Sequence, residues 1–196
     1  ILFSLNFHNR SQKEFDKLAD YLKEEGYTNR GFTVSRAAKI QKDTERMSKK
    51  IDKLITTLSS QTNLTIVVRP HPVNKLKRYN FLKKYRNVKV IREGGISEWI
   101  HHAKMVVHAS CAGGLEASVR GKPTISYLPF KSTHGHTIAD KYSKKTKNLN
   151  ECLNVIKNIT NNNTKIKKIN PKDLKLRAYN FSSNKPGYKM IADEFK

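Results

Sequence analysis

A segment rich in serine and glycine, residues 110–114, follows the apolar run 105–109 and precedes a stretch with helix-forming composition. Its residues are Ser110, Cys111, Ala112, Gly113 and Gly114. Such a junction places unpaired backbone N–H groups at a helix N-terminus, where the helix dipole favours an anion such as a phosphate. Glycine also lets a ligand approach the backbone closely. The segment predicts a phosphate-binding turn, with an ordinary strand–helix connection as the alternative.

A second segment with chemical potential is Arg69-Pro70-His71-Pro72, which follows the apolar run 64–68. The two prolines restrict the backbone and fix the orientation of Arg69 and His71. A guanidinium binds phosphate or carboxylate through two parallel hydrogen bonds. We therefore expect an anion contact here; the alternative is a rigid turn whose histidine caps a helix.

Further candidates occur near the other apolar runs. Glu116 lies one turn into the helix predicted after Gly114, where a carboxylate can accept hydrogen bonds from two ribose hydroxyls or complement the helix dipole. Arg92 and Glu93 follow a third apolar run and form either a binding pair or a surface ion pair. Tyr127 ends a later run and is included among the predicted site residues.

Alternating strands and helices are needed to bring these residues together. Strands are expected at 1–5, 64–68, 88–91, 105–109 and 124–127, and helices at 11–26, 36–59, 75–85, 97–103, 115–120 and 149–159. This alternation predicts an α/β fold with a Rossmann-like, doubly wound parallel sheet of five or six strands. Ligands of such sheets bind beyond the carboxyl ends of the strands.

The rest of the chain carries weaker signals. Ser97 is expected to cap the helix that ends at residue 103, and residues 131–147 are expected to form a loop. We predict one domain over residues 1–196, with residues 160–196 as a C-terminal extension that ends in a helix at 188–195. Because the chain begins inside an apparent strand, we expect it to be part of a longer protein.

The formal net charge of +23 suits nucleic acid, an anionic membrane or an anionic substrate. The sequence contains no recognisable nucleic-acid-binding motif, so we do not expect nucleic acid as a partner. It has no apolar run of transmembrane length and only two cysteines, which predicts a cytoplasmic protein, with association at the inner face of the membrane as a further expectation. We predict no cofactor and no metal: His101 and His102 would face different ways on a helix, and His134 and His136 have no acidic partner nearby in sequence.

Taken together, Arg69-Pro70-His71-Pro72 and the segment from Ser110 to Pro123 resemble the C-terminal, nucleotide-binding half of GT-B glycosyltransferases. The spacing of Glu116, Gly121 and Pro123 resembles the donor-binding helix of that superfamily. More closely, the pattern is similar to bacterial surface carbohydrate biosynthesis proteins, which are relatives of the Kdo transferases of capsule and lipopolysaccharide assembly. Ser110-Cys111 stands where CMP-sugar-using relatives have a Ser-Ser pair.

The resemblance implies a glycosyltransferase domain that binds a nucleotide-activated sugar, with CMP favoured, and that serves a glycan or lipid-linked acceptor. By the same resemblance, His71-Pro72 and Ser110 would hold the CMP phosphate, and Glu116 the ribose. The catalytic carboxylate and the acceptor site would lie in a missing N-terminal half. The alternatives are a UDP-sugar epimerase-like or polyol-phosphate transferase domain on the same fold, and a non-catalytic domain that binds nucleic acid or an anionic polymer.

Overall fold

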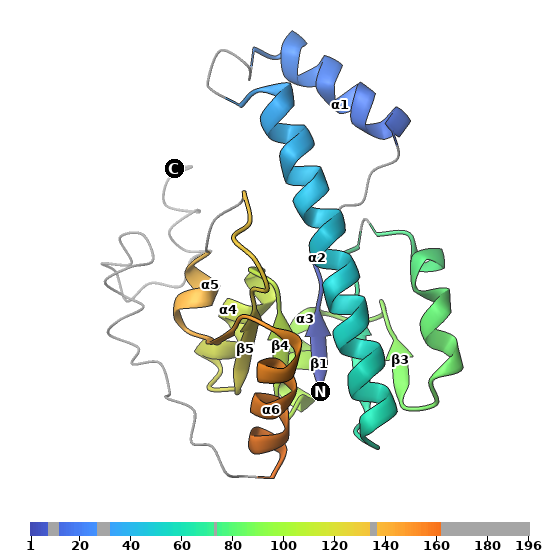
Figure 1. Cartoon of the computed structure of the whole chain (residues 1–196), viewed down its shortest axis with the longest axis vertical. Helices are drawn as coiled ribbons and strands as arrows, with labels where there is room; N and C mark the ends of the chain where they lie inside the picture. Colours follow the sequence, from blue (N-terminus) through green and yellow to red (C-terminus); the bar gives the residue numbers. More distant parts are fainter. Residues whose placement is uncertain (8–11, 27–31, 73, 134–136, 162–196) are drawn as a thin grey trace, which may run out of the picture. The chain divides into compact units, whose positions relative to one another are not determined.

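The computed structural model of the chain describes residues 1–7, 12–26, 32–72, 74–133 and 137–161 (Figure 1). Six parallel strands form one sheet in the order β3-β2-β1-β4-β5-β6. They are β1 (Leu2–Ser4), β2 (Ile66–Arg69), β3 (Val88–Val90), β4 (Val106–His108), β5 (Thr124–Tyr127) and β6 (Lys144–Thr146). The predicted α/β fold with a Rossmann-like, doubly wound parallel sheet is confirmed, and the strand order is that of dinucleotide-binding folds.

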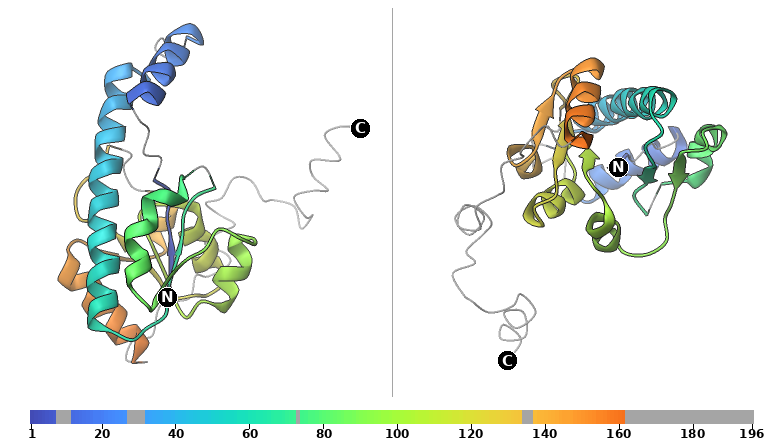
Figure 2. Two further views of the ribbon diagram at one scale, coloured as in Figure 1. Left: turned by 90° about the vertical axis from the view of Figure 1, so that its right-hand side faces the viewer. Right: turned by 90° about the horizontal axis from the view of Figure 1, so that it is seen from below.

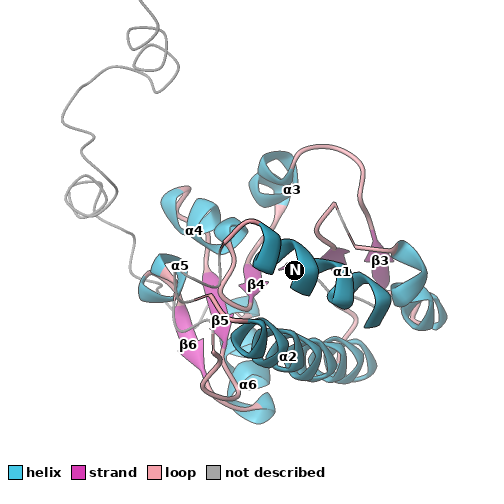
Figure 3. Ribbon diagram, turned by 90° about the horizontal axis from the view of Figure 1, so that it is seen from above, coloured by secondary structure: helices cyan, strands magenta, loops and turns pink. Residues whose placement is uncertain are grey.

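Helices cover both faces of this sheet. The helical elements are α1 (Gln12–Glu24), α2 (Val34–Gln61), the 3₁₀ helix η2 (Leu76–Lys84), α3 (Ile96–His102), α4 (Ala112–Val119), α5 (Ile138–Lys141) and α6 (Leu149–Thr160). The helices α2, η2 and α6 bury their apolar side chains against one face, and α3 and α4 against the other. Figures 2 and 3 show these two layers from the side and from the ends.

Successive residues of the central strand β1 point into the two layers. Phe3 packs in the larger core with Ile51 and Leu54 of α2, whereas Leu2 packs in the smaller core with Ile100 and Ala117. Strands covered on both faces read as continuous apolar runs, and this explains why β1, β2 and β4 were predictable from the sequence.

The long helix α2 crosses the first face and has defined ends. The hydroxyl oxygen of Thr33 accepts a hydrogen bond from the N–H of Arg36 at 3.1 Å and caps the N-terminus. Beyond the C-terminus, the side-chain amide of Asn87 donates to the carbonyls of Thr62 at 2.9 Å and Leu64 at 3.2 Å. These bonds join the end of α2 to the loop before β3.

The basic helix predicted at 75–85 is confirmed, as a 3₁₀ helix. Two other local predictions are wrong. Residues 131–147 are not one loop, because α5 and the edge strand β6 lie within them. Ser97 does not cap α3: Gly95 holds that position, and its N–H donates to the Glu98 carboxylate at 3.3 Å.

The chain divides into two units, residues 1–166 and residues 167–196. The second unit lies outside the described residues, as does the helix predicted at 188–195. Within the described part of the chain, none of the helices combines the length and the apolar character that crossing a bilayer requires.

Candidate ligand site at the carboxyl edge of the sheet

The strand order places a topological switch point between β1 and β4. The connection after β1 passes through α1 to α2, which covers one face of the sheet, whereas β4 is followed by α4 on the other face. Connections that diverge in this way open a crevice at the carboxyl ends of the two strands. Asn6 follows β1 at this crevice, and Ser110 follows β4.

A cavity of about 180 Å³ lies at this point. Its lining consists of Asn6, Phe7, Asp43, Thr44, Met47, Ala109, Ser110, Leu128, Phe130, Ser132 and Thr137. The polar groups are one carboxylate, one side-chain amide and four hydroxyls, and the apolar groups include two aromatic rings. This lining suits a single polar ring with hydroxyl groups better than a phosphate, because a carboxylate repels an anion at short range.

One wall of the cavity is the 128–133 segment, which is joined to α2. The Asp43 carboxylate accepts hydrogen bonds from the backbone N–H of Thr133 at 2.7 Å and from its hydroxyl at 2.6 Å. The Arg46 guanidinium lies 4.3 Å from the centroid of the Phe130 ring. Partial burial raises the pKa of Asp43, but the bonds from Thr133 and the charges of Lys39 and Arg46 outweigh it, and the net effect lowers the pKa. The carboxylate is therefore ionised at neutral pH.

Ser110 has a backbone conformation that is rare for a residue with a side chain. Its φ of +54° lies in the left-handed region, which costs a non-glycine residue on the order of 1 kcal/mol. The Ser110 hydroxyl donates to the Asp140 carboxylate at 2.7 Å. This bond holds the turn that ends β4 in its strained shape at the cavity wall.

Asp140 has no exposed surface, yet its carboxylate is held by several donors. Besides Ser110, these are the Ser126 hydroxyl and the Thr137 backbone N–H, the latter at 2.7 Å. Burial raises the pKa of Asp140. These hydrogen bonds and the nearby His108 lower it by more than burial raises it, so the net shift is downward. Asp140 is not among the site residues predicted from the sequence, although Thr137-x-x-Asp140 has the spacing of a helix-capping pair.

His108, at the end of β4, is fully buried beside this cluster. Its Nδ1 accepts from the Cys111 N–H at 3.3 Å, so Nε2 carries the proton and donates to the Ser143 hydroxyl at 2.8 Å. Burial lowers the pKa of His108 to about 4, against the opposing effect of Asp140. The imidazole is neutral at pH 7 and connects β4 to α5 through Ser143.

The glycines at the start of α4 allow this helix to pack closely against the sheet. A Cβ on Gly113 would lie 2.3 Å from the Ser4 hydroxyl oxygen, and one on Gly114 would lie 2.3 Å from the His108 ring. The space on the Cβ side of these glycines is therefore filled by strand side chains, and the predicted anion contact of the loop N–H groups stays a prediction. The Cys111 sulfur likewise faces inward, 3.3 Å from the Ser4 hydroxyl oxygen, and burial raises the pKa of its thiol.

Arg69 reaches the expected edge of the sheet but organises a neighbouring loop. Arg69 of β2 and His108 of β4 both pair with Ser4 of β1. The loops that follow β2 and β4 therefore begin at the same position along the strand direction. The Arg69 guanidinium donates to the carbonyl oxygens of Glu93, at 2.8 Å, and Gly94. The Trp99 indole N–H also donates to the Glu93 carbonyl at 2.8 Å. Arg69 thus fixes the loop between β3 and α3.

The remaining predicted residues lie around the same edge, outside the cavity. His71 is half-buried in a turn that its carbonyl closes by accepting from the Asn74 N–H at 2.8 Å. Glu116 accepts from the Ser97 hydroxyl and forms an ion pair with Arg120 at 3.1 Å, and its side chain is 31% exposed. The other predicted residues are placed as follows: Pro72, Arg92, Glu93 and Ala112 are exposed, and Tyr127 is buried.

Among the predicted site residues, all of which lie in the described part of the chain, Ser110 alone lines the cavity. The structure therefore brings the predicted segments to one edge of the sheet but surrounds its cavity mainly with residues of α2 and of the 128–133 segment. The nucleotide-contacting roles predicted for the other residues stay predictions.

Metal-ligating side chains do not cluster in the described ranges, where no group of three or more His, Cys, Asp or Glu residues could hold an ion. His101 and His102 are exposed on α3, and His134 and His136 lie outside the described residues. Comparisons with models of protein families, with curated proteins and with solved structures gave no match to this chain.

Proposed function

We propose that this domain is the donor-binding part of a glycosyltransferase and binds a nucleotide-activated sugar, with a CMP-linked acid sugar favoured. The observation that carries the proposal is the cavity at the switch point between β1 and β4, where sheets of this strand order bind nucleotides. The resemblance of Arg69–Pro72 and Ser110–Pro123 to nucleotide-sugar transferases supports the choice of ligand.

The chemistry of the cavity suggests which part of such a ligand would lie inside it and which part outside. A sugar ring can donate hydroxyl protons to Asp43, can exchange hydrogen bonds with Thr44 and Ser132, and can pack against Phe7 and Phe130. The phosphate and the carboxylate of an acid sugar would both stay outside, where the exposed Arg46 lies beside Phe130 and neutralises charges that Asp43 repels. In a complete transferase, this cation would stabilise the departing phosphate electrostatically.

Calorimetric titrations with CMP, UDP and CDP, and with a short DNA duplex at two salt concentrations, test the proposal. We expect CMP to bind most tightly. Tighter binding of UDP would favour an epimerase-like domain, and tighter binding of CDP a polyol-phosphate transferase. Duplex binding that weakens steeply with salt, without any mononucleotide binding, would overturn the proposal in favour of a polyanion-binding domain.

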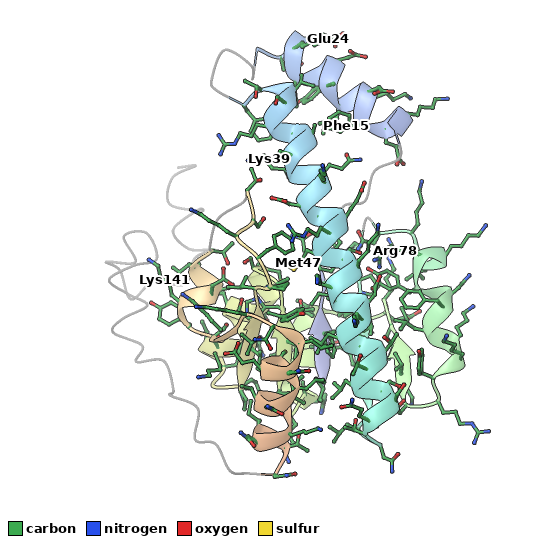
Figure 4. The ribbon with its side chains drawn as sticks, in the orientation of Figure 1. Phe15, Glu24, Lys39, Met47, Arg78 and Lys141 are labelled. Carbon is green, nitrogen blue, oxygen red and sulfur yellow. The ribbon has the colours of Figure 1, made fainter. Side chains whose placement is uncertain are left out.

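The variants His71→Ala and Glu116→Ala test the residues assigned to the nucleotide. Each is expected to weaken CMP binding about tenfold, the cost of one hydrogen bond to a charged group, without lowering the unfolding midpoint beyond that of a surface change. Glu24→Ala is the matched control, because Glu24 is exposed on α1 (Figure 4). Wild-type affinity in both test variants would show that the nucleotide does not contact these residues.

A further inference from the structure

Six exposed cations follow one another along α2. They are Lys39, Lys42, Arg46, Lys49, Lys50 and Lys53, which we call the α2 stripe. Spacings of three and four residues keep these side chains on one side of the helix. The buried residues of α2, among them Met47 and Ile51, occupy the opposite side and face the sheet. Figure 4 labels Lys39 and Met47 on α2.

The α2 stripe carries more positive than negative charge. It spans about 21 Å at the helical rise of 1.5 Å per residue. Asp43 accepts two hydrogen bonds from Thr133, and Asp52 pairs with Arg78 of η2 at 2.8 Å. Glu45 lies three residues after Lys42 and four before Lys49, so it neighbours these two cations on the helix surface. The six cations of the stripe still outnumber the three acidic residues Asp43, Glu45 and Asp52, so the stripe is exposed to solvent with a net positive charge.

This line of charge runs past the mouth of the cavity. Asp43, Thr44 and Met47 line the cavity from the same helix, and the Phe130 ring that also lines it carries the Arg46 guanidinium. A linear polyanion bound along the stripe would thus have one of its residues beside the cavity.

We infer that the α2 stripe binds a linear acidic glycan with a carboxylate on its repeating residues, as the acceptor or product of the transfer. The inference rests on the proposed function, because transfer of an acid sugar makes such a glycan. A membrane surface fits less well: the large exposed apolar residues among those described are Tyr21, Leu76, Phe81 and Val119, and none of them lies on α2. A single-stranded nucleic acid also fits less well, because the Phe130 ring beside Arg46 is only partly exposed and the Arg46 guanidinium already covers it.

The test measures binding of oligosialic acid, which carries one carboxylate per residue, to the full chain. The stripe variant is Lys42→Gln/Lys49→Gln/Lys53→Gln. The control is Lys77→Gln/Lys83→Gln/Lys89→Gln, which removes the same charge from exposed positions on η2 and β3. We expect the stripe variant to lose about tenfold or more in affinity at low salt and the control to lose far less, because only the first removes direct contacts. Replacement of the same three stripe lysines by arginine is expected to retain binding.

Equal losses in the stripe variant and the control would overturn the inference, since the net charge alone would then explain binding. It would also be overturned if phosphatidylserine vesicles or a DNA duplex, but not oligosialic acid, depended on the stripe. A measurement of CMP affinity separates this inference from the proposed function. The stripe variant is expected to bind CMP as tightly as the wild type. If the chain binds oligosialic acid through the stripe but binds no nucleotide, the glycan-binding inference holds and the proposed donor binding is refuted.

Discussion

A buried carboxylate and a buried imidazole stand side by side beneath the cavity. Asp140 is ionised because hydroxyl and backbone N–H donors surround it, whereas His108 is neutral because burial disfavours its charged form. Together they join the ends of β4 and β5 to α5 through Ser110, Ser126 and Ser143. The strained backbone of Ser110 is thus held by groups that carry no exposed surface and cannot easily exchange their partners for water.

His108 makes stability depend on pH in a defined window. Its pKa is about 4 in the folded chain and 6.5 ordinarily, so between these values the unfolded chain binds a proton that the folded chain does not. Stability therefore falls as the pH is lowered from 6.5 to 4, by on the order of 3 kcal/mol. The lowered pKa of Asp140 adds a loss only below its ordinary value of 3.8, outside this window. Urea unfolding at a series of pH values measures the slope.

The variant His108→Gln tests whether His108 causes this dependence of stability on pH. Glutamine keeps a donor for Ser143 but does not titrate, so the variant is expected to be less stable at pH 7 and to show a shallower pH dependence between 4 and 6.5. His101→Gln is the control, because His101 is exposed on α3. An unchanged slope in His108→Gln would mean that the imidazole is not the group that titrates.

At the scale of elements, α4 lies close to the sheet because it begins with glycines. Alanine normally stabilises a helix relative to glycine by up to about 1 kcal/mol. In Gly114→Ala, however, the new Cβ would meet the His108 ring, and we expect a net loss of about 1–3 kcal/mol in urea unfolding. Gly95→Ala is the matched change, since a Cβ there meets nothing nearer than the Glu98 carboxyl carbon at 4.0 Å. A Gly114→Ala chain as stable as Gly95→Ala would disprove the close packing.

The sequence predicted the buried elements better than the exposed ones, for a physical reason. Strands β2 and β4 are apolar up to their last residues, Arg69 and His108, because helices cover them. Gly121 ends α4 as expected, with φ of +70°. Strand β6, in contrast, lies at the sheet edge, where Lys144 and Lys145 are exposed and give no apolar pattern.

The candidate site was predictable in its position but not in its lining. Parallel strands bring their carboxyl ends to one edge, so the turn at Ser110 was found from local composition alone. Asp140 and Asp43 reach this edge from α5 and α2, and no local motif connects either residue with Ser110. Their contribution depends on tertiary contacts across long sequence separations, which composition and periodicity do not report.

At the scale of the whole chain, the net charge of +23 has a general consequence. Repulsion among the excess cations opposes compaction, and salt screens it over a Debye length of about 10 Å at 0.1 M. We expect the urea midpoint to rise when sodium chloride is raised from low concentration to about 0.1 M. The half-buried pair Arg78–Asp52 is screened less than the exposed cations. Potassium chloride at equal ionic strength is the control, and a midpoint that falls with salt would contradict the expectation.

The position of β1 at the centre of the sheet governs the order of folding. Its residue Leu2 pairs with Val67 on one side and with Val106 on the other. Strand β1 therefore cannot form its ladder with β2 until the chain has been synthesised through Arg69, and its ladder with β4 needs residues up to His108. Such distant pairing slows folding, and in that interval the apolar segment Leu2–Ser4 is open to association with other chains.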